Sequence, residues 1–208
     1  LFGADRVPVD LCISPEQLVT RYIEQLIRYP GAFQVLDFAD GKVRLVGVRA
    51  HRDGPLVGQE IRTLRDHIPE IETRIAGGGN IGFRVAQALE GTNQVKLIER
   101  SRDRARMISE RLAKTIVLSG DAADEELLLE ENIDSSDVFV SLTNAEEVNI
   151  LSAMLAKRLG CKKVMALINR PAYAELVEGP RIDVGISPPQ ITIGALLAYV
   201  RQSGMVRI

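Results

Sequence analysis

The chain contains 208 residues, of which 46% are hydrophobic and 26% charged, so a packed core is expected and an intrinsically disordered chain is excluded. Its formal net charge of −2 argues against nucleic acid as the main partner. The longest apolar runs, such as 191–200, are too short to span a bilayer and no signal peptide is recognised, so we expect a soluble protein without direct membrane insertion.

The first strong signal along the chain is a helix that begins at Ser14, after a short strand-like alternation over 7–11. Ser14 can cap this helix, Pro15 suits its first position, and Gln17 completes a capping box. Pro30-Gly31 is expected to end it. One face of the helix is apolar and comprises Leu18, Tyr22, Ile23 and Leu26.

A hairpin is predicted next. The runs 33–38 and 43–48 are strand-like, and Asp40-Gly41 between them is typical of a β-hairpin turn. A short helix is then expected over 61–65, ending before Pro69.

From residue 73 onward, strand and helix patterns alternate strictly. This alternation predicts a parallel, doubly wound α/β sheet, in which ligands bind at the carboxyl ends of the strands. The first expected strand ends at Ala76, and the others cover 94–99, 115–119, 137–142, 163–168 and 182–186. The expected helices cover 81–90, 102–113, 124–131, 145–159 and 171–178, and a last helix begins at Pro188.

A glycine-rich stretch lies at the first strand-to-helix junction of this series. Gly77, Gly79 and Gly82 have the spacing G-x-G-x-x-G, with Asn80 and Ile81 between the last two. Glycine permits a tight turn and lets backbone N–H groups approach a pyrophosphate, while the following helix directs its positive end at the anion. Because glycine triplets also form ordinary turns, the motif alone leaves both interpretations open.

The second strand of the series strengthens the nucleotide interpretation. Glu99 ends this strand, 20 residues beyond Gly79, at about the spacing at which a carboxylate binds the ribose hydroxyls in a dinucleotide-binding fold. A carboxylate there would repel the 2′-phosphate of NADP. We therefore expect NAD(H) or ATP/ADP.

The chain also contains an internal repeat. When Ser14 is aligned with Ser187, both segments consist of a strand, a Ser-Pro-x-Gln start, an amphipathic helix, a basic end and a glycine. We interpret residues 1–31 as the tail of a first nucleotide-binding fold and 73–208 as most of a second. The matching pairs are Asp10/Asp183, Ile13/Ile186, Ser14/Ser187, Pro15/Pro188, Gln17/Gln190, Arg28/Arg201 and Gly31/Gly204.

Four stretches, Val35–Lys42, Gly77–Gly82, Lys96–Arg100 and Ser152–Arg158, resemble the regulatory subunits of bacterial Trk potassium uptake systems, which are built from tandem RCK (KTN) domains. The resemblance covers essentially the whole chain. It implies a tail and crossover helix of a first Rossmann-like half over 1–31, part of a small α+β domain over 32–72, and a second Rossmann-like half over 73–208. The chain departs from the family pattern between Ile71 and Gly77, where the family has further strands.

The resemblance also implies which residues line a nucleotide cleft. Asp121 and Ala122 follow the third strand of the series, and Thr143 and Asn144 follow the fourth, at positions that line the cleft in the family. The alternative is that Asp121 and Asn144 only cap the next helices. Arg100 is expected either to contact a phosphate or the adenine, or to be an ordinary surface arginine.

No catalytic or metal site is predicted. The histidines, His51 and His67, lack the surroundings of a catalytic base, no His/Cys cluster suits zinc, and Cys12 and Cys161 are expected to be buried thiols in a reducing compartment. An NAD-dependent oxidoreductase is the alternative function, but no Tyr-x-x-x-Lys pair is present.

The preferred interpretation is a nucleotide-sensing protein without enzyme activity; a structural scaffold with a vestigial cleft is the third possibility. The resemblance implies a cytoplasmic gating-ring subunit, peripheral on the inner membrane face through an integral-membrane potassium channel subunit. It also implies a homodimer or homotetramer. The helices at 14–28 and 188–202 are expected at the contacts, with Leu26 and Leu196 among the interface residues.

Overall fold

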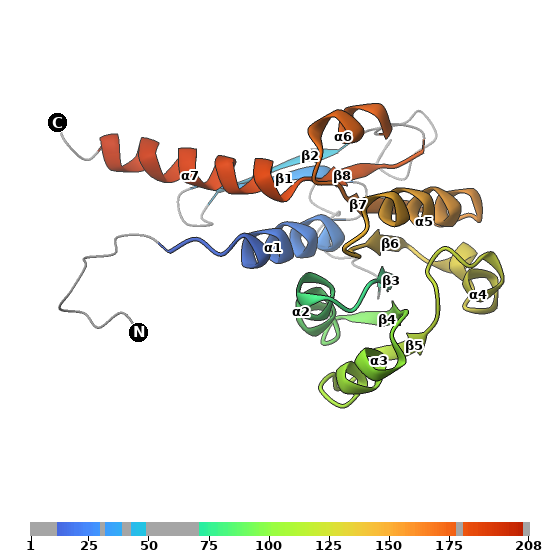
Figure 1. The fold of residues 1–208 in the computed structure, drawn as a ribbon. Helices are drawn as coiled ribbons and strands as arrows, with labels where there is room; N and C mark the ends of the chain where they lie inside the picture. Colours follow the sequence, from blue (N-terminus) through green and yellow to red (C-terminus); the bar gives the residue numbers. More distant parts are fainter. Residues whose placement is uncertain (1–11, 30–31, 39–42, 49–70, 178–180, 206–208) are drawn as a thin grey trace, which may run out of the picture.

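The computed structural model describes residues 12–29, 32–38, 43–48, 71–177 and 181–205. Its centre is a six-stranded parallel sheet (Figure 1) formed by β3 (Ile71–Ala76), β4 (Asn93–Glu99), β5 (Ile116–Ser119), β6 (Val138–Ser141), β7 (Lys163–Leu167) and β8 (Val184–Ile186). The strand order is β5-β4-β3-β6-β7-β8, and every neighbouring pair is parallel. The predicted doubly wound α/β sheet is therefore confirmed.

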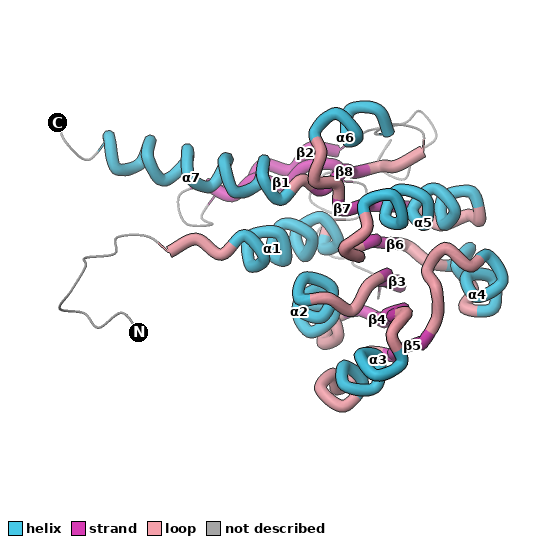
Figure 2. Tube along the Cα trace, viewed as in Figure 1, coloured by secondary structure: helices cyan, strands magenta, loops and turns pink. Residues whose placement is uncertain are grey.

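Helices cover both faces of this sheet, as Figure 2 shows. One hydrophobic cluster joins the sheet to helices α1, α2 and α3, and a second joins it to α4, α5 and α6. The helices are α1 (Pro15–Arg28), α2 (Asn80–Leu89), α3 (Arg102–Ser109), α4 (Glu125–Glu130), α5 (Glu146–Arg158), α6 (Pro171–Val177) and α7 (Pro188–Met205), with a short 3-10 turn, η2 (Ile133–Ser135).

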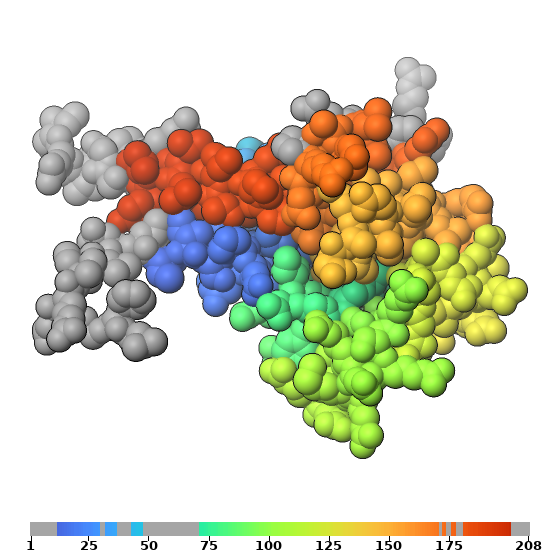
Figure 3. Space-filling view, viewed as in Figure 1, coloured from blue at the N-terminus to red at the C-terminus, as the bar shows by residue number. Residues whose placement is uncertain are grey.

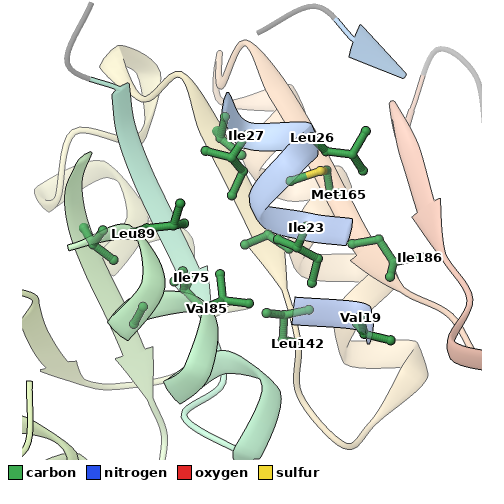
Figure 4. Packing of buried hydrophobic residues seen from close by; sticks show 14 of the residues in the cluster. Val19, Ile23, Leu26, Ile27, Ile75, Val85, Leu89, Leu142, Met165 and Ile186 are labelled. Carbon is green, nitrogen blue, oxygen red and sulfur yellow. The ribbon is translucent and has the colours of Figure 1, made fainter. Parts of the chain in front are cut away.

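Helix α1 lies in the core of the domain although the sequence assigned it to a different unit. Figure 4 shows its apolar side chains between residues of β3 and α2 on one side and of β7 and β8 on the other. Ile23, Leu26 and Ile27 are fully buried there. The prediction that Leu26 lies at an interface between subunits is therefore wrong, because this chain's own sheet covers it.

The start of α1 also differs from the prediction. Ser14 is the N-cap residue, but its side chain makes no capping hydrogen bond, so the predicted capping box is not formed. Pro15 does occupy the first helical position, where its missing N–H leaves no hydrogen bond unmade.

A buried lysine holds the carboxyl end of α1 against the sheet. The Lys163 ammonium, on β7, donates to the carbonyl oxygen of Leu26 at 2.9 Å and to that of Ala32 at 2.6 Å. Burial lowers the pKa of Lys163 from 10.5 to about 8, and Asp183 partly opposes this shift. Lys163 thus adds a polar contact from the sheet to both the end of α1 and the start of the hairpin, beside their apolar packing.

The predicted hairpin is present as the antiparallel pair β1 (Ala32–Phe38) and β2 (Val43–Val48). Its Asp40-Gly41 turn lies outside the described residues, as do the alternation over 7–11, the helix expected over 61–65, and Pro69. Most other predicted boundaries agree within about two residues. Helix α3, however, ends at Ser109 and not at 113.

Helix α7 continues from β8 and runs along α1 at the surface of the molecule, as Figure 3 shows. Several of its apolar side chains are exposed. They are Ile193, Leu196, Leu197 and Val200, with exposed fractions of 44–61%.

Candidate functional site

The glycine stretch forms a turn that requires its first glycine. Gly77 follows β3 with φ = 98°, a left-handed conformation that residues with a Cβ rarely adopt. A Cβ at this position would lie 2.9 Å from the backbone nitrogen of Thr143. The turn thus brings the end of β3 close to the loop that follows β6.

The other two glycines of the motif have different roles. Gly79 is the N-cap residue of α2, and no atom lies within 4 Å of the position of an added Cβ. At Gly82 a Cβ would lie 1.9 Å from the carbonyl oxygen of Gly77, so only glycine allows α2 to pack this closely. A tight turn, open space for a pyrophosphate and close helix packing are the three glycine roles of a dinucleotide-binding loop.

Glu99 is attached directly to this loop. One carboxylate oxygen accepts a hydrogen bond from the N–H of Gly78 at 2.7 Å, and the other accepts one from the N–H of Ser101 at 2.8 Å. A carboxylate can accept about four hydrogen bonds, so acceptor capacity remains for hydroxyl groups. The ribose-binding role predicted for Glu99 fits this position, at the end of β4 beside the glycine turn.

Asp121, Ala122 and Arg100 lie around the same cleft. Arg100 is 84% exposed, with its Nε 3.9 Å from a carboxylate oxygen of Asp121. The other Asp121 oxygen accepts from the N–H of Ala123 at 2.9 Å. The cap of α4 is Asp124, so Asp121 does not have the helix-capping role considered as the alternative.

Thr143 and Asn144 form the opposite wall, in the loop after β6. Asn144 is exposed, and the N-cap residue of α5 is Ala145, so Asn144 is not a helix cap either. Thr143 is held by Asn149, whose amide oxygen accepts from the Thr143 N–H at 2.8 Å.

The side chains of Asn80 and Ile81 turn toward α1 and not toward the cleft. The Asn80 amide donates to Glu16 on α1 at 3.1 Å, and Ile81 packs against the core cluster that contains α1. Their contribution to a ligand is therefore limited to backbone N–H groups. Within α2 the first backbone hydrogen bond runs from Phe83 to Gly79, which leaves the N–H groups of 80–82 without a partner in the helix.

A cleft of about 370 Å³ lies at the carboxyl ends of β3, β4, β5 and β6. This volume lies within the roughly 300–1,000 Å³ that ligand pockets occupy. Because the connections after β3 and β6 run to opposite faces of the sheet, this is the topological switch point at which such sheets bind ligands. Eight of the predicted residues line the cleft, whereas Asn80, Ile81 and Gly82 do not; the eight are Gly77, Gly79, Glu99, Arg100, Asp121, Ala122, Thr143 and Asn144. Six lining residues are not among the predicted site residues: Ile98, Arg104, Gly120, Leu142, Ala145 and Val148.

A larger cavity of about 570 Å³ lies at the amino ends of β3, β4 and β5. Two of its basic side chains are already paired with carboxylates. Arg74 donates to Glu72 at 3.2 Å, and Lys96 donates to Glu131. The cavity is remote from the glycine turn, so we place the functional site at the smaller cleft.

Two further properties bear on the kind of site. Within the described ranges, no group of three or more histidine, cysteine, aspartate or glutamate side chains is placed to hold a metal ion. None of the helices in the described parts of the chain combines the length and apolar content needed to cross a membrane.

Comparison with known proteins gives a consistent picture. The model of the TrkA-N domain family matches residues 73–188, which is more than half of the chain. The whole chain is 47% identical to the Trk system potassium uptake protein TrkA of Vibrio alginolyticus and 40% identical to that of Haemophilus influenzae. The chain spans 57% of the length of these relatives. The alignments extend over 260 positions against 208 residues, so the relatives contain residues that this chain lacks.

Solved structures show the same fold at low sequence identity. The TrkA-N domain of the inner membrane protein ybaL from Escherichia coli has a TM-score of 0.54 at 16% identity, and covers 61% of this chain and 93% of that domain. The NAD(P)-binding domain of an exopolyphosphatase-related protein from Archaeoglobus fulgidus has a TM-score of 0.57 at 11% identity, with coverage of 64% and 99%. GsuK bound to ADP has a TM-score of 0.51 at 17% identity, with coverage of 61% and 35%.

Proposed function

Because this chain belongs to the TrkA-N domain family, we propose that it is the nucleotide-sensing part of a cytosolic regulatory subunit of a potassium transport system. The observation that carries the proposal is the open space beside Gly79, in a loop whose preceding residue, Gly78, donates its N–H to Glu99. The ligand is NAD(H) or ATP/ADP.

The pyrophosphate and the ribose of such a ligand each have a matching group in the cleft. The pyrophosphate lies against Gly79 and the amino end of α2, where unpaired N–H groups and the helix dipole favour an anion. The ribose hydroxyls donate to Glu99. The likeness to GsuK, whose structure was solved with ADP, supports an adenine nucleotide.

The set of side chains that line the cleft favours a sensor over an oxidoreductase. Among the described residues that line it, none is a histidine, lysine, cysteine or tyrosine, the side chains that most often transfer a proton in hydride-transfer enzymes. Glu99, the carboxylate nearest the glycine turn, is engaged with two backbone N–H groups. The protein therefore binds the nucleotide without converting it, and no NADH absorbance change is expected with a panel of small alcohols and carbonyl compounds.

The partner is an integral-membrane potassium channel subunit, and the protein is peripheral on the cytoplasmic face through that subunit. The relatives at 47% and 40% identity, both named for Trk potassium uptake, support this assignment. A homodimer or homotetramer is formed through α7, whose exposed apolar stripe is available for a neighbouring copy. Occupancy changes channel opening because the nucleotide binds one conformation of the assembly more tightly than another.

Titration calorimetry with NADH, NAD, ATP and ADP tests the binding step. Gly79→Ala places a methyl group in the open space and is expected to weaken binding about tenfold or more. Gly91→Ala is the matched control, because Gly91 also has no atom within 4 Å of an added Cβ but lies in the turn after α2, away from the cleft. The proposal is wrong if none of the four nucleotides binds wild type at about 1 mM, a concentration that would detect even weak sites.

A further inference from the structure

A single buried amide connects the cleft to the far strands of the sheet. Asn149, on α5, is 1% exposed. Its oxygen accepts from the N–H of Thr143 at 2.8 Å and from the Thr143 hydroxyl at 2.7 Å. Its NH₂ group donates to the carbonyl oxygens of Thr143 and Leu167, both at 3.0 Å. The loop that lines the cleft is therefore fixed to the last residue of β7.

From Leu167 the connection continues through the backbone to α7. Ile168 donates its N–H to the carbonyl oxygen of Ile186 at 2.8 Å. Ile186 is the last residue of β8, and Ser187 follows it immediately before α7 begins. The path from the Thr143 loop to the first turn of α7 thus consists of the Asn149 side chain, the backbone hydrogen bond from Ile168 to Ile186, and Ser187.

A second link from α5 runs parallel to the first. Glu146, which is 8% exposed, accepts a hydrogen bond from the N–H of Arg170 at 2.9 Å. Arg170 lies in the segment between β7 and α6. Because two side chains in the first turns of α5 hold this segment, a shift of the cleft loop displaces the β7 end as well.

Ser187, between β8 and α7, has a buried hydroxyl that a second conformation of the first turn of α7 would satisfy. Ser187 is 4% exposed, and its hydroxyl has no hydrogen-bond partner in the described part of the chain. A buried hydroxyl without a partner destabilises the conformation that leaves it unpaired. An N-cap serine ordinarily accepts from the third helical N–H, here that of Gln190, so a small rotation of the first turn would relieve this destabilisation.

We propose that Asn149 is a positioning residue that couples nucleotide occupancy of the cleft to the position of the first turn of α7. This proposal rests on the proposed function. Ligand contact with Thr143 and Asn144 shifts their loop, Asn149 passes the shift to Leu167, and β8 passes it to Ser187. The coupling requires only that the nucleotide bind more tightly when α7 is in one of its two positions.

Hydrogen exchange measured by mass spectrometry tests the coupling, with NADH and ATP as separate probes at saturation confirmed by calorimetry. In wild type, each bound probe changes exchange in 142–146 and in 186–193 by about threefold or more. Asn149→Asp keeps the shape of the side chain and the oxygen that accepts from Thr143, but it replaces the NH₂ group with an oxygen and so removes both donations to carbonyl oxygens. It is expected to bind the probe and retain the response in 142–146 while losing that in 186–193.

Two further variants separate coupling from a general loss of stability. Asp137→Asn removes a carboxylate that accepts from the N–H of Glu72 at the opposite end of the sheet, and it should keep both responses. Ser187→Ala leaves the cleft intact and removes the hydroxyl that favours the second position, so it should bind normally with a weakened response in 186–193. It also provides the test if Asn149→Asp does not fold.

The possible outcomes are distinguishable. If wild type binds none of NADH, NAD, ATP and ADP, both this proposal and the proposed function are wrong. If wild type binds a nucleotide without a response in 186–193, only the coupling is wrong. If Asn149→Asp binds and transmits the full response to 186–193, or if Asp137→Asn loses that response equally, only the coupling role of Asn149 is wrong. A full response in Ser187→Ala also contradicts it.

Discussion

Helices α1 and α7 begin with the same Ser-Pro-x-Gln pattern but have opposite environments. Ile23 and Ile27 of α1 are fully buried, whereas the residues aligned with them in α7, Leu196 and Val200, are 44% and 61% exposed. The local pattern therefore specifies a helix in both places. What covers each helix is decided by the tertiary structure.

The difference has a geometric cause. Helix α1 packs on Met165 of β7 and Ile186 of β8, on the face that a helix following β8 could otherwise cover. Helix α7 does follow β8, but it lies outside α1 and extends along the surface. The sheet thus uses a helix from the first repeat as part of its core, and the helix of the second repeat remains available for another partner.

The largest expected effect comes from placing a charge at one of two aligned positions. Ile27→Asp buries a carboxylate in the core, and we expect a loss of more than about 4 kcal/mol or failure to fold. The aligned Val200→Asp should change the free energy of unfolding of the isolated chain by less than about 0.5 kcal/mol. Urea denaturation measures both, and equal losses would show that α7 is also part of the core.

Removal of the lysine that anchors α1 has the next largest effect. Lys163→Met leaves the carbonyl oxygens of Leu26 and Ala32 without this donor, and the expected cost at neutral pH is about 1–3 kcal/mol. The control is Lys162→Met, which removes an exposed lysine paired with Asp137 and should cost at most about 1 kcal/mol. If the two variants are equally stable in urea denaturation, Lys163 does not anchor the helix.

The same lysine predicts a dependence of stability on pH. The pKa of Lys163 is lowered to about 8 in the folded chain, so above this pH the unfolded state binds more protons and the Lys163 contribution to stability rises. The slope is at most about 1.4 kcal/mol per pH unit. Burial raises the pKa of Cys161 from 9.0 to about 11, which lowers stability above about pH 9 because the unfolded thiol ionises first.

Measurements between about pH 7.5 and 9 therefore isolate the lysine. Wild type should gain stability across this window, and Lys163→Met should not. A gain of the same size in both proteins would assign the pH dependence to another group.

A smaller effect is expected on self-association through α7. Leu196→Asp should raise the dissociation constant of the assembly about tenfold without unfolding the chain, because it places a charge in an apolar contact. Leu151→Asp is the control, since Leu151 is 61% exposed on α5, away from this stripe. Sedimentation equilibrium measures both. Wild type that stays monomeric at high concentration would contradict the interface.

The smallest effect concerns the helix starts. Because Ser14 makes no capping hydrogen bond, Ser14→Ala should cost less than about 0.5 kcal/mol. Asp124→Ala should cost about 1 kcal/mol, because the Asp124 side chain accepts from two backbone N–H groups of α4. Thermal denaturation distinguishes these values. A loss of about 1 kcal/mol or more for Ser14→Ala would indicate that the capping box forms after all.

The parts of the site that sequence reasoning predicted are those with local chemistry. Gly77, Gly79 and Gly82 have backbone requirements that their spacing reveals, and Glu99 lies at the end of the next strand. Arg104 was missed because only residues directly after the strands were considered, whereas the first turn of α3 also borders the cleft. Asn149 was missed because its partners lie 6 and 18 residues away in the sequence.

The position of α1 shows a different limit. Its apolar stripe was recognised, but a stripe does not identify the surface that covers it. Sequence reasoning expected α1 to pack on a Rossmann-like body other than that of its own repeat, in the same chain or in a neighbouring subunit. The structure shows that this body is the second sheet of the same chain. The division of the chain at residues 31 and 72 stays a prediction. The hydrophobic core includes residues on both sides of each position.

The most direct test is hydrogen exchange of α1 and α7 without ligand, over about a hundredfold range of protein concentration. We expect the amides of 15–28 to exchange slowly and independently of concentration, because this chain's own sheet covers them. Those of 188–205 should exchange quickly at low concentration and slow down as copies associate. Slow, concentration-independent exchange in α7, or fast exchange in α1, would contradict the conclusion that the sheet buries the first helix and leaves the second available for a partner.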